Sequence, residues 1–296
     1  MPEPRPQDLI SSDSNPQVKR ARALLKDSAG GHGHRFGDLF AAEGVQIATR
    51  ALRADGWDID SVILSDGETA GLSSSPGTPG ARDRTEAPAA AALEDIERLA
   101  AERRLPVVHV TASAFLRLTQ RQMPAGAVVI AHRRARRLDE MPGSDPLLVL
   151  ERPSTPGNIG TIVRTCEAAG LGGVVLVGPH ADPFSPAAVR SSMGSVFGMP
   201  VATGVAAGDL ITWARRSGRA LIGTSGGAAQ SLWDADLPAR SAIVLGNEGA
   251  GMTPELQAAC DAMVRIPFNP AVDSLNLSAA AAVIAFEYRR RLPFAD

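Results

Sequence analysis

Short apolar runs alternate with amphipathic stretches along the second half of the chain, from residue 146 to residue 296. The runs recur roughly every 20–30 residues, and the stretches between them repeat apolar residues at helical spacing. Strands separated by helices in this way form a mostly parallel sheet that helices cover on both faces. The predicted strands are residues 147–151, 174–178, 200–205, 220–225, 241–246 and 262–268. The predicted helices are a short one after the first strand and residues 186–197, 208–218, 253–260 and 274–291.

The first half of the chain also predicts an α/β domain, with weaker periodicity. Predicted helices cover residues 15–26, 44–56, 93–104 and 113–119, and predicted strands cover residues 59–65, 106–110 and 126–132. Residues 67–88 are rich in Gly, Ser, Thr and Pro, which predicts a flexible insertion. We therefore expect a disordered tail at residues 1–14, a first domain at 15–133, a linker at 134–145 and a second domain at 146–296.

Composition narrows the class of protein. The 296 residues are 44% hydrophobic and 21% charged, with a formal net charge of −2, as in an ordinary globular protein. No apolar run approaches the ~20 residues of a membrane-spanning helix, and the first residues do not look like a targeting segment. The two cysteines form no motif, which favours a reducing compartment. We expect a cytoplasmic protein that contacts no membrane.

Positive charge is concentrated between residues 17 and 137, in two clusters. Lys19, Arg20 and Arg22 belong to the first predicted helix, and Arg133 and Arg134 follow the last predicted strand of the first domain. Such clusters can neutralise RNA phosphates. A solvated helix face and a charged linker explain the same clusters equally well.

The segment after the strand at residues 147–151 carries the first candidate site. Asn158 is expected to cap the following helix, and Gly170 to end it. Arg164 lies off the helix's apolar stripe, at what is otherwise an ordinary surface position. The segment has neither a G-x-G-x-x-G fingerprint nor a G-x-x-x-x-G-K-[ST] loop, which argues against the two commonest nucleotide-binding sites. The apolar stripe consists of Ile159, Ile162, Val163, Cys166 and Ala169.

Three later segments add to this site. Residues 190–200 predict a helix with small residues on one side. Residues 243–252 predict a buried strand that opens into a loop with three glycines, which would let a ligand approach the backbone closely. The alanine-rich helix at residues 274–291 must pack tightly against other backbone.

Taken together, these segments resemble the SpoU/TrmH-type RNA ribose methyltransferases of the SPOUT class. The resemblance rests on three ordered motifs: N-x-G-x-x-x-R at residues 158–164, L-G-N-E-G-x-G at 245–251 and S-L-N-L-S at 274–278. It is strong over residues 146–296. Residues 15–133 more weakly resemble the ribosomal-protein-like substrate-binding domain that is common upstream in this class.

The resemblance implies an open parallel sheet with a deep C-terminal trefoil knot, beside a smaller N-terminal α/β RNA-binding domain. It implies a homodimer through the C-terminal domains. It also implies methyl transfer from S-adenosyl-L-methionine to a ribose 2′-hydroxyl of structured RNA, with ribosomal RNA favoured over transfer RNA. The residues it assigns to the cofactor are Thr224, Leu245, Gly246, Gly251, Ile266 and Leu275. The residues it assigns to catalysis are Arg164, Asn158, Glu248, Ser274 and Asn276.

The resemblance places Arg164 at the 2′-hydroxyl. Because an arginine normally stays protonated, we expect it to orient the hydroxyl and the adjacent phosphate, and a role as base stays open. Asn158 and Asn276 are expected to fix the geometry. Glu248 is expected to position Arg164 or its neighbours through a charge-assisted hydrogen bond, with Ser274 supporting the same cluster.

Two other functions stay open. The chain could be an RNA-binding module that keeps the fold without the chemistry, or, less favoured, a nicotinamide-dependent oxidoreductase, whose glycine fingerprint is missing. The five histidines show no metal-ligand spacing, so no metal is expected. The target nucleotide, a housekeeping or an antibiotic-resistance role, and the role of residues 67–88 are left open.

Overall fold

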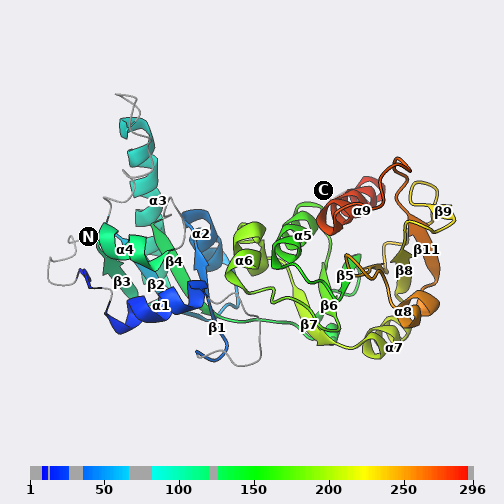
Figure 1. Cartoon of the computed structure of the whole chain (residues 1–296). Coiled ribbons are helices and arrows are strands. Elements are labelled where there is room, and N and C mark those ends of the chain that lie inside the picture. The colour runs from blue at the N-terminus through cyan, green and yellow to red at the C-terminus, as the bar shows by residue number, and fades with distance from the viewer. Residues whose placement is uncertain (1–8, 13, 27–35, 67–81, 120–125, 293–296) are drawn as a thin grey trace. The chain divides into compact units, whose positions relative to one another are not determined.

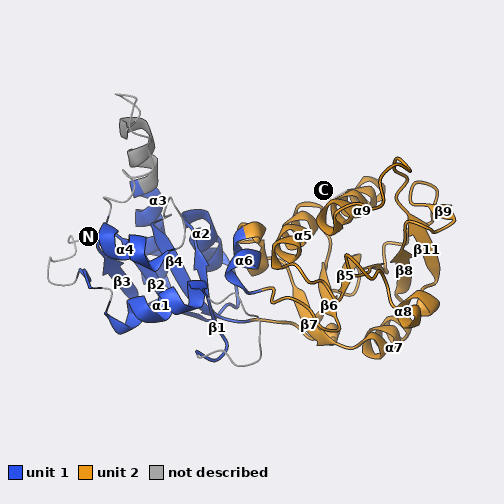
Figure 2. Cartoon of the chain, viewed as in Figure 1, with its two compact units in different colours: residues 1–133, 184–190 blue, residues 134–183, 191–296 orange. Residues whose placement is uncertain are grey.

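The structure, a computed structural model, describes residues 9–12, 14–26, 36–66, 82–119 and 126–292, and only the backbone of residues 82–89 (Figure 1). These residues form two compact units (Figure 2). Unit 1 comprises residues 1–133 and 184–190, and unit 2 comprises residues 134–183 and 191–296.

Unit 1 is built on a four-stranded sheet. In order across the sheet, the strands are β1 (Leu39–Glu43), β4 (Ala127–His132), β2 (Ile59–Ser65) and β3 (Val107–Val110). β4 is antiparallel to both of its neighbours, and β3 is parallel to β2. Helices α1 (Pro16–Lys26) and α4 (Ala112–Leu118) share one apolar core with the sheet. Helices α2 (Val45–Arg53) and α3 (Arg82–Glu102) contact each other.

Unit 1 differs from the prediction in four places. Strand β1 was not predicted, although it is buried. Helix α3 begins at Arg82, inside the predicted insertion, whose residues 67–81 lie outside the described residues. Within the predicted disordered tail, Ile10 forms a parallel bridge with Val110, while residues 1–8 and 13 lie outside the described residues. Residues 184–190, predicted as part of the second domain, group with unit 1. The Phe184 ring packs against the Phe40 ring there, with 5.2 Å between the two ring centres.

Unit 2 contains a seven-stranded sheet whose neighbouring strands all pair in parallel. In order across the sheet, the strands are β7 (Val201–Val205), β6 (Gly173–Val177), β5 (Leu147–Glu151), β10 (Ser241–Leu245), β8 (Ala220–Thr224), β11 (Ala262–Arg265) and β9 (Gln230–Ser231). The predicted parallel sheet is confirmed. β5 and β10 are neighbouring parallel strands. The segments that follow them therefore lie side by side although they are far apart in the chain.

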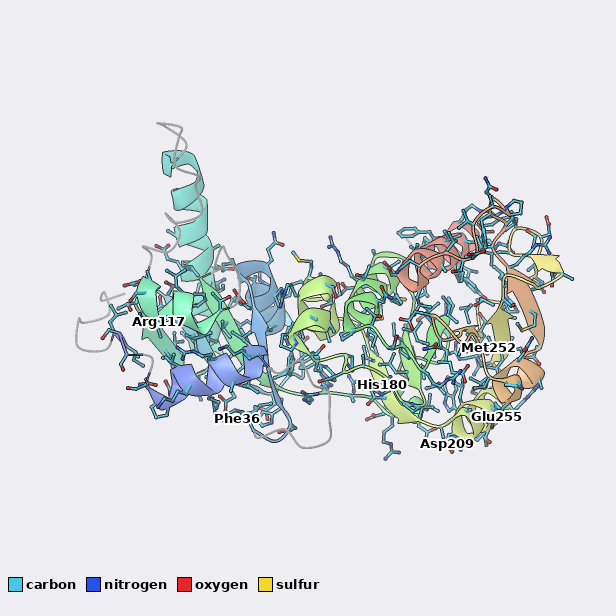
Figure 3. All side chains as sticks on the ribbon, in the orientation of Figure 1. Phe36, Arg117, His180, Asp209, Met252 and Glu255 are labelled. Carbon is cyan, nitrogen blue, oxygen red and sulfur yellow. The ribbon has the colours of Figure 1, made fainter. Side chains whose placement is uncertain are left out.

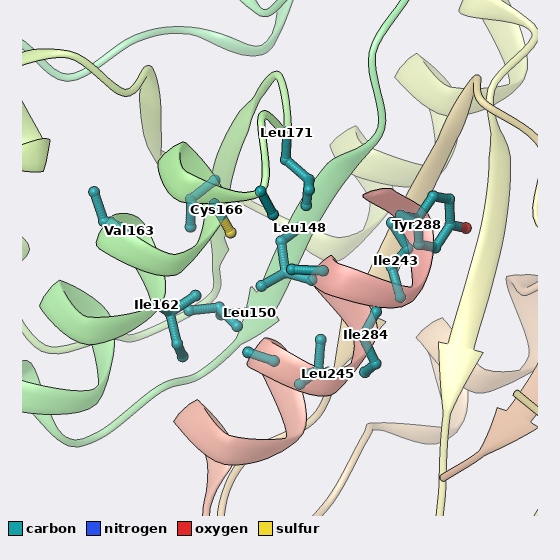
Figure 4. Packing of buried hydrophobic residues seen from close by; sticks show 14 of the residues in the cluster. Leu148, Leu150, Ile162, Val163, Cys166, Leu171, Ile243, Leu245, Ile284 and Tyr288 are labelled. Atoms are coloured by element: carbon teal, nitrogen blue, oxygen red, sulfur yellow. The ribbon is translucent and has the colours of Figure 1, made fainter. Parts of the chain in front are cut away.

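Helices cover both faces of this sheet, because successive residues of each strand point to opposite sides. Helices α5 (Pro156–Ala168) and α9 (Leu277–Arg291) pack on the face that carries Leu148, Leu150 and Leu245 (Figure 4). Helices α7 (Ala207–Ser217) and α8 (Pro254–Ala259) pack on the face that carries Val149 and Val244. Burying the side chains of both faces contributes about 25 cal/mol per Å² of apolar surface.

In the predicted second domain, the observed helix boundaries differ from the prediction at three sites. Thr155, not Asn158, is the N-cap of α5, and Asn158 lies in the first turn. The helix predicted over residues 186–197 is interrupted: α6 (Pro186–Ser192) ends before Met193, which has a φ of 51°, and a short 3-10 helix, η3 (Ser195–Phe197), follows. Helix α9 begins at Leu277, because Asn276 caps it by accepting a hydrogen bond from the Ser278 backbone nitrogen at 2.9 Å.

The predicted linker, residues 134–145, belongs to unit 2 and includes the short 3-10 helix η2 (Leu138–Glu140). The buried Arg219 guanidinium fixes the C-terminal end of this segment by donating to the carbonyl oxygens of Pro142 at 2.8 Å and Asp145 at 2.6 Å. Among the described residues, no helix is long and apolar enough to cross a membrane.

Candidate functional site

A cavity of about 460 Å³ opens at the carboxyl ends of β8 and β10 in unit 2. Ligands of open parallel sheets bind at this edge, because the strands end there in loops that can surround them. Most of the lining comes from three segments distant in the chain: residues 224–226 after β8, residues 245–252 after β10, and residues 263–277 around and after β11. Gln257 of α8 and Ala280 and Ile284 of α9 complete it. Met252, labelled in Figure 3, belongs to the second segment.

All six residues that the resemblance assigned to a cofactor line this cavity: Thr224, Leu245, Gly246, Gly251, Ile266 and Leu275. Two of the positions require glycine. A Cβ on Gly246 would collide with the backbone of Gly251 and Met252, and Gly251 has a φ of +69°, in the left-handed region that other residues rarely adopt. Backbone, rather than side chain, therefore forms this wall of the cavity.

The glycine loop, residues 245–252, is closed on itself by hydrogen bonds. The backbone nitrogens of Asn247 and Gly251 each donate to the carbonyl oxygen of the other residue at 3.0 Å. The Asn247 side-chain oxygen accepts from the backbone nitrogens of Gly249 at 3.0 Å and Ala250 at 2.9 Å. These bonds within the loop satisfy the backbone nitrogens of Asn247, Gly249, Ala250 and Gly251 without a ligand.

Glu248 of the glycine loop joins two of the three sequence motifs. Its Oε1 accepts a hydrogen bond from the Asn158 side-chain amide at 3.2 Å, and its Oε2 accepts from the Ser154 hydroxyl at 3.1 Å. The Asn276 side-chain amide lies 3.5 Å from the Asn158 side-chain oxygen, at the limit of a hydrogen bond. Three predicted catalytic residues, one from each motif, therefore form one chain of polar contacts.

The environment keeps the Glu248 carboxylate ionised. Burial acts to raise its pKa, but hydrogen bonds from its own backbone nitrogen, from Ser154 and from Asn158 outweigh burial and hold the pKa below the ordinary value. Sequence reasoning missed Ser154. Its position could have indicated a role, because Ser154 is a hydroxyl residue in the loop between β5 and α5, at the edge of the sheet where the other polar site residues lie.

Arg164 lies apart from this chain of contacts. Six residues separate it from Asn158 on α5, which corresponds to about 9 Å along the helix axis. Its side chain is exposed and makes no hydrogen bond or ion pair with any residue that the structure describes. Glu248 therefore accepts the expected hydrogen bond from the neighbour Asn158 and not from Arg164. Ser274 lines the cavity but contributes no hydrogen bond to the cluster among the described residues.

The cavity wall carries negative charge. The lining residues include the carboxylates of Glu248 and Asp273, and no lysine, arginine or histidine. Asp273 is exposed, and its carboxylate has no hydrogen-bond or ion-pair partner in the described part of the chain. Such a wall favours a ligand with a positive charge near it.

The five cations predicted to contact RNA differ in their surroundings. Lys19 is exposed on α1. Arg20 forms an ion pair with Asp60 and donates to the Ser61 hydroxyl at 3.2 Å, so most of its charge is neutralised within unit 1. Arg22, Arg133 and Arg134 are half-buried, and the Arg133 guanidinium lies 5.9 Å from the centre of the Phe184 ring.

The strand-end His132 has acidic neighbours. Its Nδ1 lies 2.9 Å from Asp38 and its Nε2 lies 3.8 Å from Asp58. The hydrogen bond with Asp38 is the largest effect, and it raises the pKa of His132 above the ordinary value. Within the ranges that the structure describes, no group of three or more His, Cys, Asp or Glu residues is arranged to hold a metal ion.

Comparison with known proteins places the chain in a family. The model of the SpoU rRNA methylase family matches residues 145–286. The 23S rRNA (guanosine-2'-O-)-methyltransferase RlmB of Bordetella pertussis is 31% identical over 205 residues, which cover 67% of this chain and 82% of that protein. The chain belongs to the SpoU rRNA methylase family.

Two further similar proteins extend the comparison. The 23S rRNA (uridine(2479)-2'-O)-methyltransferase of Streptomyces viridochromogenes is 33% identical over 177 residues, covering 57% of this chain and 62% of that relative, so the match spans less than two thirds of its length. The AdoMet-bound rRNA methyltransferase of Sinorhizobium meliloti has a TM-score of 0.78 and 31% identity, covering 96% of this chain and 97% of that chain. The similarity of fold to that structure therefore extends over nearly the whole chain, whereas the family model matches residues 145–286.

Proposed function

We propose that this protein is an S-adenosylmethionine-dependent methyltransferase that modifies a ribose 2′-hydroxyl of structured ribosomal RNA. The observation that carries the proposal is the meeting of the three motifs at one cavity: Asn158, Glu248 and Asn276 contact in a chain, and Glu248 and Ser274 line the cavity itself. The names of the relatives, 23S rRNA 2′-O-methyltransferases, support the reaction and the substrate class.

The cavity suits S-adenosylmethionine. Its volume of about 460 Å³ lies within the roughly 300–1,000 Å³ of typical small-molecule sites. The wall at Gly246 offers bare backbone, and the apolar side chains of Leu245 and Ile266 suit an adenine ring. Glu248 and Asp273 match a cofactor whose sulfonium and ammonium groups are positive. The similar structure from Sinorhizobium meliloti has AdoMet bound.

When bound, the cofactor supplies a methyl group that is already activated by the sulfonium. The protein's task is then to hold the ribose hydroxyl in line with that methyl group and to let its proton leave. Glu248, kept ionised, anchors Asn158 and fixes the glycine loop against α5. Arg164 orients the hydroxyl and the adjacent phosphate, since an exposed guanidinium without a partner among the described residues can contact both.

We extend the proposal to a homodimer that pairs through α5 and α9, in which Arg164 of one protomer serves the cavity of the other. The separation of about 9 Å along α5 between Arg164 and Asn158 supports this arrangement. The neighbouring helix α9 has an exposed aromatic side chain, Phe286, with 51% of its surface accessible. Exposed arginine and aromatic side chains on two adjacent helices are typical of an interface.

The C-terminal trefoil knot is part of the same proposal. The glycine loop after β10 and residues 266–275 after β11 line one cavity, while β8, earlier in the chain than β10, lies between β10 and β11. A trefoil knot requires the end of the chain to pass through a loop that was formed earlier in the sequence. The strand order β10-β8-β11 supports such a path. Mechanical stretching from both ends would detect it, as a fully extended length shorter than that of 296 unknotted residues.

We assign RNA binding to unit 1. Of the five predicted RNA contacts, Lys19 is exposed and has no ion-pair partner in the described part of the chain. RNA with folded structure is recognised by shape and by phosphate contacts. Because Arg20 is already paired with Asp60, it contributes less to such contacts than the sequence suggested.

Calorimetric titration with S-adenosylmethionine, followed by incubation with methyl-labelled cofactor and ribosomal or transfer RNA, tests the proposal. We expect one cofactor per protomer and label in ribosomal RNA. Cofactor binding without label in either RNA would favour a binding module that lacks the chemistry. Binding of NADH in place of S-adenosylmethionine would favour an oxidoreductase.

A further inference from the structure

Arg152, the residue that follows β5, has an unusual backbone conformation. Its φ is 53°, in the left-handed region, where the Cβ of any residue other than glycine is crowded. Its backbone nitrogen donates to the Val177 carbonyl oxygen at 2.8 Å, so the conformation is fixed by the sheet. Strained positions of this kind persist only where the surrounding structure holds them in that conformation.

The conformation lets one residue hold two parts of the glycine loop. The Arg152 Nη2 donates to the Gly251 carbonyl oxygen at 3.2 Å. Its own carbonyl oxygen accepts from the Asn247 side-chain amide at 2.8 Å. The arginine stem has room because Gly178 has no side chain: a Cβ there would lie 3.0 Å from the Arg152 Cγ.

The neighbouring residue acts on the same loop. The buried Glu151 carboxylate accepts from the Thr253 backbone nitrogen at 2.8 Å, just past the loop, and its Oε1 lies 3.6 Å from the Arg152 Nε. Asn247 and Gly251 are the two residues whose backbone bonds close the loop. Arg152 therefore braces both ends of that closure from the end of β5.

We infer that Arg152 is a positioning residue for the cofactor: it fixes the glycine loop in its binding shape without lining the cavity itself. The inference rests on the proposed function, because it assumes that the loop holds S-adenosylmethionine. Left-handed backbone at Arg152 keeps its carbonyl and its side chain directed at the loop together.

Arg152→Gly separates this role from a general structural one. Glycine accepts the left-handed backbone more readily than arginine, so the melting temperature stays the same or rises. The guanidinium bond to the loop is lost, so the dissociation constant for S-adenosylmethionine rises about three- to tenfold, while kcat at saturating cofactor is retained. A residue with only a structural role would lower the melting temperature and leave the dissociation constant unchanged.

Arg104→Gly is the matched control. Arg104 is an exposed residue of unit 1 with a φ of 56°, so the substitution relieves the same backbone strain far along the chain from the loop. Its cofactor affinity should match that of the wild type. Arg152→Lys, which restores a donor of similar reach, should recover part of the lost affinity.

Hydrogen exchange supplies a readout that needs no cofactor. In Arg152→Gly, the amides of Gly249, Ala250, Gly251 and Thr253 should exchange faster than in the wild type and in Arg104→Gly. Unchanged exchange, or an unchanged dissociation constant, would overturn the inference. If the wild type binds no S-adenosylmethionine, the proposed function fails, and faster exchange in Arg152→Gly would then still assign the loop brace but not its link to the cofactor.

Discussion

The side-chain amide of Asn158 donates a hydrogen bond to the Glu248 carboxylate across 3.2 Å, although the two residues lie 90 positions apart in the chain. The bond ties the first turn of α5 to the glycine loop. Because Glu248 also lines the cavity, any change at this pair reaches both the helix that carries Arg164 and the wall of the site.

Glu248→Gln should reduce methyl transfer. A glutamine presents an amide group to the donors of Asn158 or Ser154, so at least one of these hydrogen bonds is replaced by two donors that face each other. We expect kcat/KM to fall by roughly tenfold to a hundredfold. Glu255→Gln, at an exposed acid on α8, is the control and should leave kcat/KM unchanged. Equal kinetics for the two variants would remove Glu248 from the site.

Arg164→Ala should keep S-adenosylmethionine affinity and lose methyl transfer, because Arg164 does not line the cavity. Calorimetry and a methyl-transfer assay measure the two properties separately. Arg240→Ala, at another exposed arginine, should change neither. Loss of cofactor affinity in Arg164→Ala would instead assign the residue to folding or to the cofactor pocket.

Mixing two impaired variants tests whether the site is shared between protomers. If Arg164 serves the partner's cavity, a dimer of one Arg164→Ala chain and one Glu248→Gln chain contains one intact site. An equal mixture should then recover roughly a quarter of wild-type activity after exchange of subunits. No recovery, with exchange demonstrated by mass, would place Arg164 and Glu248 in the same protomer's site.

Asp273→Asn should weaken the preference for a charged cofactor. The exposed carboxylate attracts the sulfonium of S-adenosylmethionine, and the demethylated product has a neutral thioether in its place. We expect the ratio of the two dissociation constants to change by roughly two- to fivefold, as for exposed charge pairs, and less at high salt. Asp209→Asn, at an exposed acid of α7, should leave the ratio unchanged. A uniform loss of affinity for both ligands would contradict this role.

Acid stability should depend on Glu287 of α9. The hydrogen bond from Arg290 is the main effect that lowers the pKa of Glu287 to about 2, burial opposes it, and Arg291 adds to it. Since the folded pKa is depressed, the stabilisation is complete above the ordinary pKa of 4.5 and is lost as the pH falls toward about 2. Urea unfolding between pH 6 and pH 2 should show a smaller loss for Glu287→Gln than for the wild type. Parallel curves would show that the ion pairs of Glu287 do not matter for stability.

The sequence predicted the sheet of unit 2 well because its strands are apolar on both faces and are separated by helices with a clear apolar stripe. The same stripe predicted the buried side of α5, where Ile159, Ile162 and Cys166 are all buried. Strand β1 was missed because its five residues, LFAAE, are as compatible with a helix as with a strand. Its assignment depends on pairing with β4, a contact across almost 90 residues.

Six of the cavity-lining residues were predicted from the resemblance to the SpoU/TrmH-type methyltransferases, which assigned them to the cofactor. Their partners could not be predicted. The local sequence does not show that Asn158 donates to Glu248, because the two residues are far apart in the chain. It also does not show that the helix begins at Pro156, which makes Thr155 the N-cap in place of Asn158. The left-handed backbone of Arg152 was likewise invisible, because arginine gives no signal for it.

The central claim is that the cavity and Arg164 together methylate a ribose 2′-hydroxyl in ribosomal RNA. The most direct test maps 2′-O-methyl groups in ribosomal RNA from cells with the protein, without it, and with only Arg164→Ala. The account predicts a methyl group on one ribose that is missing without the protein, returns with the wild type and does not return with Arg164→Ala. An unchanged set of ribose methyl groups, or a protein-dependent methyl group on a base, would contradict it.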